Sequence, residues 1–173
     1  MSLQDIVNFA DRANRVVGRY KIDFTLAPKK LSRPTYCLSS LSWSFIDYGL
    51  ADIEKVPNNK RGIYAFVASQ IGNVMPPHGY VMYIGIAGRD SQRSLRARYR
   101  DYLNDKTVNK RPHIALMIGT WHSVLKFYFA PIDANVSADL LKRIELELNS
   151  ALMPPFSRGD LEASTKRMRR AFP

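Results

Sequence analysis

Two apolar segments, 61–69 and 80–87, most constrain how this chain folds. Both are predicted to be strands, because isoleucine, valine, tyrosine and phenylalanine dominate them. They lie close together in the sequence, which favours an antiparallel hairpin whose long connection contains glycine and proline. Each segment also carries an aromatic–glycine triplet: Gly-Ile-Tyr at 62–64 and Tyr-Ile-Gly at 83–85. On their own, such triplets are also compatible with ordinary strand residues.

The spacing of apolar residues in the rest of the chain predicts further elements. Helices are expected at 2–17, 94–105, 137–153 and 160–170, and a third strand at 124–132. The apolar run 114–118 fits a helix or a strand equally well. Three antiparallel strands flanked by helices make a small α+β fold. We therefore divide the chain into a helical N-terminal extension that packs on the core (1–60), a core domain (61–157) and a basic C-terminal tail (158–173).

Length and composition narrow the class of protein. The chain has 173 residues and 46% hydrophobic content, which fits one domain of ordinary size. No apolar run approaches the ~20 residues that span a bilayer, and the N-terminal residues lack the apolar core of a signal peptide. Cys37 is the only cysteine, so no intrachain disulfide can form. These features predict an intracellular, cytoplasmic protein with no membrane partner.

The charge of the chain is strongly positive. Twenty-six Lys and Arg oppose fifteen Asp and Glu, giving a net charge of +11 and a pI of about 10.0. The excess is concentrated in three blocks, 12–33, 89–111 and 158–173. Nucleic acid is the first candidate partner, because clustered cations displace counterions from phosphates. A membrane surface or an acidic protein is the second candidate partner. The remaining explanation is that the charge serves only to keep the protein soluble.

An ordered set of motifs joins the hairpin to the helices that follow. After the two triplets come "LRARYRDYL" at 95–103 and then Glu145, which stands in E-x8-P spacing to Pro154 of "MPPFS" (153–157). In this order the motifs resemble the GIY-YIG nuclease family over roughly residues 61–157. The resemblance implies a metal-dependent DNA endonuclease, either restriction-like or structure-selective. Cutting both strands would then need a homodimer or two successive nicks.

The resemblance also implies roles for individual residues. Tyr64 and Tyr83 match active-site phenols, one of which helps to activate the attacking water, and Arg98 matches the arginine that contacts phosphate. Glu145 matches the glutamate that binds one divalent cation, Mg²⁺ or alternatively Mn²⁺. His113 corresponds to a proton carrier or phosphate contact, with an ordinary loop histidine as the alternative. A free tyrosine has a pKa of ~10 and is a poor base, so nearby cations are expected to lower it.

Further basic residues are expected to hold the phosphate backbone, and two positions depart from the family pattern. The expected nucleic-acid contacts are Arg89, Arg93, Arg96, Arg100, Lys110, Arg111 and Ser157. Ser157 stands where the family often has asparagine, and Ile86 stands where many members have lysine; Arg89 or Arg93 is expected to supply that charge. No small-molecule cofactor is expected.

Two other classes of function fit the same sequence. The first is a nucleic-acid-binding protein of this fold that has lost catalysis, which the departures at Ser157 and Ile86 favour. The second is a basic protein-interaction module that does not touch DNA. The individual residues also have ordinary structural readings: half-buried strand tyrosines, a surface arginine and a solvated helix carboxylate.

Overall fold

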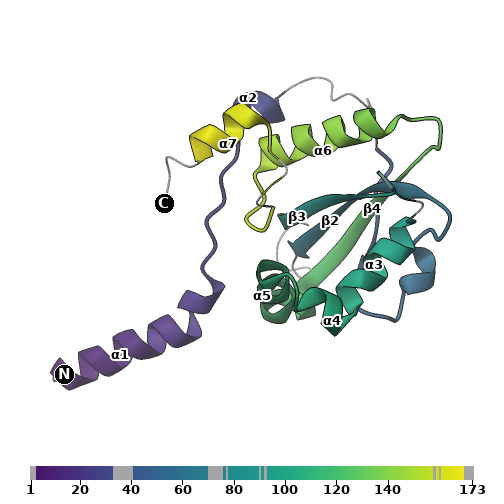
Figure 1. Ribbon diagram of the computed structural model, residues 1–173. Coiled ribbons are helices and arrows are strands. Elements are labelled where there is room, and N and C mark those ends of the chain that lie inside the picture. The colour runs from purple at the N-terminus through teal and green to yellow at the C-terminus, as the bar shows by residue number, and fades with distance from the viewer. Residues whose placement is uncertain are drawn as a thin grey trace.

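A four-stranded antiparallel sheet lies at the centre of the protein (Figure 1). In this computed structural model the strands are β1 (Ser44–Asp47), β2 (Arg61–Ser69), β3 (Gly79–Ala87) and β4 (Leu125–Ile132), in the order β1-β4-β2-β3. The α+β class is confirmed, but the expected three-stranded sheet is wrong. The additional strand, β1, comes from the N-terminal extension and pairs with β4.

The described residues are 3–32, 41–69, 76, 78–89, 91, 93–157, 159 and 161–169. Cys37, most of the connection between β2 and β3, and the two ends of the chain lie outside them. The predictions made for those positions therefore lie outside the described residues. In the part of the chain that is described, no helix is both long and apolar enough to cross a membrane.

The two central strands form the predicted hairpin, with one irregularity. Tyr64 on β2 stands opposite Gly85 on β3, and Phe66 stands opposite Tyr83. The register then shifts between Phe66 and Val67, so that Val67 pairs with Val81. One extra residue on β3 makes a β-bulge, which reorients the side chains on either side of it.

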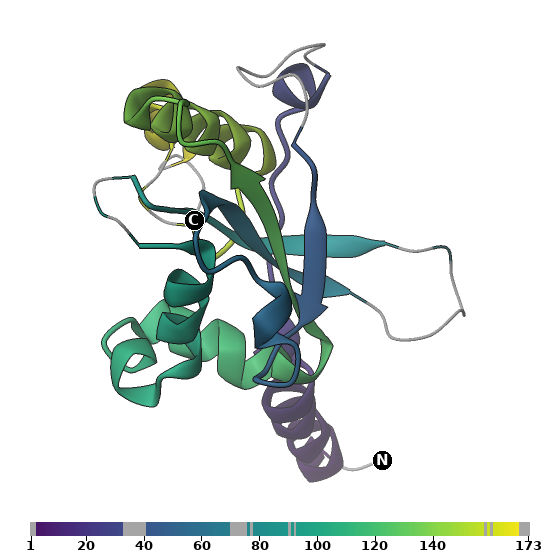
Figure 2. The same cartoon turned by 90° about the vertical axis from the view of Figure 1, so that its right-hand side faces the viewer.

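Helices cover both faces of the sheet (Figures 1 and 2). One face carries Phe66 and Phe127 and is covered by α3 (Leu95–Leu103), α4 (Asp105–Val108) and α5 (Pro112–Trp121). The other face carries smaller aliphatic side chains such as Ile63 and Ile84, which pack against Leu141 and Ile144 of α6 (Ala138–Leu152). The sheet is thus the middle layer of three, which buries both of its faces.

Local sequence signals explain where the helices begin and end. Ser94 caps α3 by accepting a hydrogen bond from the Ala97 amide at 3.2 Å, and Ser137 caps α6 in the same way. Helix α6 ends at Leu152. The next residue, Met153, has a left-handed φ of 40° and is followed by Pro154. The ambiguous run 114–118 is helical, as part of α5, because Pro112 occupies the first turn.

The N-terminal extension divides into parts with different surroundings. Residues 41–60 lie against the core through β1, Tyr48 and Val56. By contrast, α1 (Leu3–Val16), which is followed by η1 (Gly18–Tyr20), extends away from the sheet (Figures 1 and 2). Apolar side chains of α1 such as Ile6 and Phe9 are exposed.

The short α2 (Pro28–Leu31) returns to the body of the protein. There the Ala27 amide donates to the Ala151 carbonyl at 3.0 Å. Lys30 forms an ion pair with Glu162, just before α7 (Ala163–Arg169). The extension is therefore tied to the C-terminal part of the chain as well as to the sheet.

The segment after α6 covers the outer edge of β3. The Phe156 amide donates to the Met82 carbonyl at 3.0 Å, and the Ile84 amide donates to the Ser157 hydroxyl at 3.1 Å. These bonds satisfy backbone groups that an edge strand would otherwise expose. They also fix the position of β3 on both sides of Tyr83.

Candidate active site

Four elements converge on one cleft of about 300 Å³ at the outer edge of the sheet. β2 contributes Tyr64, β3 contributes Tyr83, α3 contributes Arg98 and α6 contributes Glu145. The remaining lining residues come from β3 and the loop that leads to α3: Gly85, Ile86, Ala87, Gly88, Arg89, Ser91 and Arg93. Motif residues that are far apart in the sequence thus line the same cleft.

Gly85 makes room for the phenol of Tyr64. A Cβ atom built on Gly85 would lie 2.5 Å from Tyr64 Oη and 2.7 Å from Tyr64 Cζ, both far inside van der Waals contact. The same atom would lie 3.1 Å from Cε1 of Tyr83. Glycine at this position is therefore a packing requirement that links the two triplets across the hairpin.

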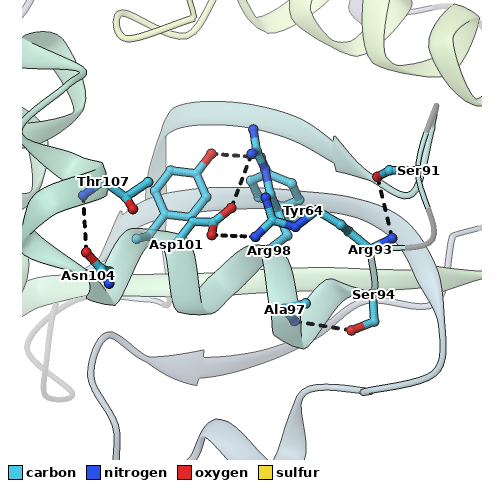
Figure 3. A network of polar contacts seen from close by, with 10 residues as sticks. Tyr64, Ser91, Arg93, Ser94, Ala97, Arg98, Asp101, Asn104 and Thr107 are labelled. Carbon is cyan, nitrogen blue, oxygen red and sulfur yellow. Dashed lines mark hydrogen bonds and ion pairs between the residues drawn. The ribbon is translucent and has the colours of Figure 1, made fainter.

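The Tyr64 phenol is the centre of a buried polar network (Figure 3). Arg98 Nε donates to Tyr64 Oη at 3.0 Å, and Tyr64 Oη lies 2.7 Å from the hydroxyl of Tyr102. Tyr64 and Tyr102 are both 0% exposed, whereas Tyr83 is only partly buried. Tyr64 therefore positions the guanidinium of Arg98, and Tyr83 is the phenol more accessible from the cleft.

Asp101 and Tyr102 belong to this network although the sequence interpretation did not select them. Asp101 accepts from Arg93 Nη2 at 2.6 Å and from Arg98 Nη1 at 3.4 Å, so it holds the two guanidinium groups side by side (Figure 3). Tyr102 shares a hydrogen bond with Tyr64 and lies beneath the guanidinium of Arg111, 4.5 Å from its ring centroid. The available signal was helical spacing, because these residues follow Arg98 by three and four positions.

Burial raises the pKa of both cleft tyrosines. For Tyr64 the loss of water dominates, the neighbouring phenols Tyr102 and Tyr83 add to the rise, and the charge of Arg98 opposes it without reversing it. The pKa of Tyr83 is raised for the same main reason, with Glu145 adding a smaller rise. Arg98 lowers the pKa of both tyrosines, as expected, but burial outweighs this effect, so at neutral pH both phenols keep their protons.

Alkaline pH is expected to destabilise the folded protein through its buried tyrosines. Burial raises the pKa of Tyr99 to about 12 and that of Tyr64 well above its ordinary value, whereas an unfolded tyrosine ionises near pH ~10. Above that pH the unfolded chain releases protons that the folded chain retains. The free energy of unfolding should then fall by up to ~1.4 kcal/mol per pH unit for each such tyrosine.

Urea unfolding between about pH 8 and 11 would measure this effect. That range brackets the pKa of ~10 of a free tyrosine. Tyr99→Phe should give a shallower loss of stability with pH than the unsubstituted chain. Equal slopes for the two proteins would contradict the prediction.

Glu145 brings a carboxylate to the cleft from α6. Its side chain is 5% exposed and lies close enough to Tyr83 to affect the pKa of that phenol. Glu147, the nearest rival in the sequence, instead accepts from Arg143 Nε at 3.3 Å, one turn away on the same helix. The two-residue step between the glutamates thus gives them different partners.

The donor set fits a hard divalent cation held mainly by substrate and water. Among the described residues, no three His, Cys, Asp or Glu side chains gather into a metal cage. Mg²⁺ is often bound through one or two carboxylates, with water and phosphate oxygens completing its octahedron. Glu145, in an open cleft that also carries arginines for the phosphate, fits that pattern.

Several residues expected at the site lie elsewhere. His113 is in the first turn of α5 and does not line the cleft, because Pro112 begins a new helix there. Arg96 donates to the carbonyls of Val56 and Glu54 and pairs with the Glu54 carboxylate, so it anchors η2 (Ile53–Lys55) rather than substrate. Ser157 is 0% exposed and bonded to the backbone of Ile84, so the expectation of a nucleic-acid contact is wrong for this hydroxyl.

The other predicted phosphate contacts have mixed placements. Arg89 and Arg93 line the cleft, and Arg93 shares the carboxylate of Asp101 with Arg98. Arg100 and Lys110 are exposed but do not line the cleft. Arg111 is partly buried, and its guanidinium lies over the ring of Tyr102. Arg89 and Arg93 thus bring positive charge to the cleft wall that also contains Ile86.

Comparison of the chain with models of protein families, with curated proteins and with solved structures found no match.

Proposed function

We propose that this protein is a metal-dependent DNA endonuclease of the GIY-YIG type. The observation that carries the proposal is the convergence of Tyr64, Tyr83, Arg98 and Glu145 on one cleft from four separate elements. A phosphodiester hydrolase needs a positioned phosphate, a source of positive charge around phosphorus and a place for the attacking water. The cleft offers groups suited to each of these needs.

Arg98 is the residue best placed to hold the reacting phosphate. Its Nε and Nη1 are engaged with Tyr64 and Asp101 in the described contacts, and a guanidinium has five N–H donors in all. The remaining donors can meet phosphate oxygens in the forked geometry that lysine lacks. Tyr64 and Asp101 fix the orientation of the Arg98 guanidinium. The group therefore needs little rearrangement in the transition state, when the negative charge on the phosphate oxygens is greatest.

The tyrosines contribute as neutral hydrogen-bonding groups. Because burial keeps the pKa of Tyr83 high, its phenol retains a proton and can orient a water or a phosphate oxygen by donating to it or accepting from it. Glu145 is the residue that would hold a divalent cation, which when bound would polarise the phosphoryl oxygen. In the reaction a water oxygen loses a proton to solvent and forms a bond to phosphorus. A P–O ester bond of the DNA strand breaks, and the leaving oxygen takes up a proton from solvent.

Cleavage of DNA only in the presence of a divalent cation is the expected result for the purified chain. Supercoiled, linear and branched DNA would be incubated with Mg²⁺, with Mn²⁺ or with EDTA, and the products separated by gel electrophoresis. The comparison of substrates distinguishes restriction-like cutting from selection of branched structures. Intact DNA under every metal condition would overturn the enzymatic proposal.

The alternative is a nucleic-acid-binding protein that uses the same cleft without cutting. Ile86 favours it, because an apolar side chain lines the cleft at the position where the resemblance leads us to expect lysine. The same experiment separates the two proposals. Salt-sensitive binding without cleavage would support the alternative, since phosphate contacts weaken as salt rises.

A further inference from the structure

A second, larger cleft of about 610 Å³ adjoins the candidate active site. The two clefts share a wall formed by Gly88, Arg89, Ser91 and Arg93. The second cleft is completed by the segment that leads into β2, by the start of α3 and by the end of β4: Asn58, Asn59, Lys60, Arg61, Ser94, Ile132 and Ala134. A ligand that extends beyond the active site across this wall would enter the second cleft.

The described residues that line the second cleft carry several positive charges. They include Lys60, Arg61, Arg89 and Arg93 but no aspartate or glutamate. The amide and hydroxyl groups among the other lining residues are further hydrogen-bonding partners for an anion. In the described contacts, two carboxylates reach these cations from outside the lining. Asp101 accepts from Arg93 at 2.6 Å and offsets part of its charge. Asp133 lies 3.9 Å from Lys60 and is 81% exposed, and such a pair neutralises little charge in water.

Arg61 is held in place without a carboxylate partner in its described contacts. Its Nη2 donates to the carbonyls of Asp133 and Ala134 at 3.3 and 3.1 Å, and its Nε is buried with no hydrogen bond. Gly88 packs closely on it: a Cβ at that glycine would lie 2.5 Å from Cβ of Arg61. The positive charge of Arg61 is therefore fixed in the wall of the cleft by neutral groups.

The neighbouring helix end does not supply the anion-binding groups. At the start of α3, the Leu95 and Arg96 amides donate to the carbonyls of Lys60 and Pro57, and the Ala97 amide donates to the Ser94 hydroxyl. In other proteins, the backbone N–H groups at a helix N-terminus are the ones that bind phosphate. Here they already have protein partners. Recognition in this cleft therefore falls to side chains, and above all to the half-exposed Lys60.

We infer that the second cleft binds a backbone phosphate of the same DNA strand, next to the phosphate held in the active site. Lys60 and Arg89 are the contacting cations, and Arg61 supplies fixed positive charge in the wall. This inference rests on the proposed nuclease function, because it takes the occupant of the first cleft to be a phosphodiester. It adds a subsite that holds the substrate away from the reacting bond, and it adds Lys60 and Arg61 to the expected phosphate-binding residues.

Charge reversal at Lys60 tests the inference, with Lys55→Glu as the matched control. Lys55 is 68% exposed, pairs with Asp52 and lines neither cleft, so the control makes the same change in net charge. Binding of a fluorescent DNA duplex would be measured in a Glu145→Gln background over a range of salt concentrations. Lys60→Glu should weaken binding at least about fivefold more than Lys55→Glu, and should lower the salt slope by about one more counterion.

Neutral phosphate analogues locate the contact on the strand. Methylphosphonates placed one at a time around the scissile position should weaken binding of the Lys60-containing protein at one flanking position. In Lys60→Glu, and more mildly in Lys60→Gln, that position should lose most of its sensitivity, because the partner of the phosphate is gone. Thermal unfolding of each variant checks that the fold is retained.

The outcomes distinguish this inference from the function on which it rests. Equal weakening by Lys60→Glu and Lys55→Glu, with unchanged methylphosphonate sensitivity, would overturn the second cleft as a subsite while leaving cleavage by the parent chain intact. A parent chain that neither binds nor cuts DNA would instead remove the proposed function, and the subsite with it.

Discussion

Replacement of Glu145 by glutamine is expected to lower the rate of DNA cleavage by about 10²–10³-fold or more while DNA binding persists. Glutamine has nearly the same shape, so the packing of this 5%-exposed side chain is kept, but a neutral amide is a far weaker ligand for a hard divalent cation. Binding should hold or improve slightly, because the change removes a negative charge beside phosphate. Single-turnover cleavage and fluorescence anisotropy on the same duplex measure the two effects.

Glu147→Gln is the matched control for that experiment. Glu147 lies on the same helix, is nearly as buried at 9% and pairs with Arg143, but it does not line the cleft. Its substitution should change the cleavage rate by less than about threefold, because Glu147 does not reach the cleft and its partner Arg143 is 70% exposed, so the pair contributes little. A similar loss of activity in both variants would indicate damage to α6 in general, and would count against Glu145 as the metal ligand.

The sequence predicted the sheet only in part, for a physical reason that β1 makes clear. The hairpin and β4 are long runs of apolar residues whose pattern is visible locally. In contrast, β1 has only four residues, and Ile46 is its single buried side chain. Its stability comes from pairing with β4 far along the chain, and such a long-range contact leaves almost no local signature.

The site was predictable to the extent that its residues carry a distinctive spacing. Tyr64, Tyr83, Arg98 and Glu145 stand in ordered motifs, and the structure places them in one cleft. Basic residues without such spacing were harder to assign. For Arg96, the sequence gives the charge but not the direction of the side chain, which turns away from the cleft to η2.

Burial decided the remaining differences between sequence and structure. The Ser157 hydroxyl is suited to a phosphate contact. In the structure it instead accepts a hydrogen bond from the Ile84 amide of β3 and is fully buried. The protonation of Tyr64 differs from expectation for the same reason, because loss of water outweighs the charge of Arg98. Neither burial nor desolvation can be read from residue types alone.

Gly85→Ala is expected to disable the candidate site through Tyr64. The added methyl would lie 2.5 Å from Tyr64 Oη and 2.7 Å from its Cζ, so the ring must move or the strands must separate. Such overpacking typically costs about 1–3 kcal/mol of stability. Movement of the phenol also releases Arg98 Nε from its 3.0 Å hydrogen bond, and a misplacement of about 1 Å can cost ~10²-fold in rate.

The matched control for Gly85→Ala is Gly119→Ala in α5, where a new Cβ meets nothing within 4 Å. That change should leave cleavage unaltered and stabilise the protein by up to about 1 kcal/mol, because alanine favours a helix interior more than glycine does. Urea unfolding and single-turnover cleavage of both variants make the comparison. If Gly85→Ala kept full activity and stability, Tyr64 would not be held against β3 as described, and the orientation of Arg98 would need another cause.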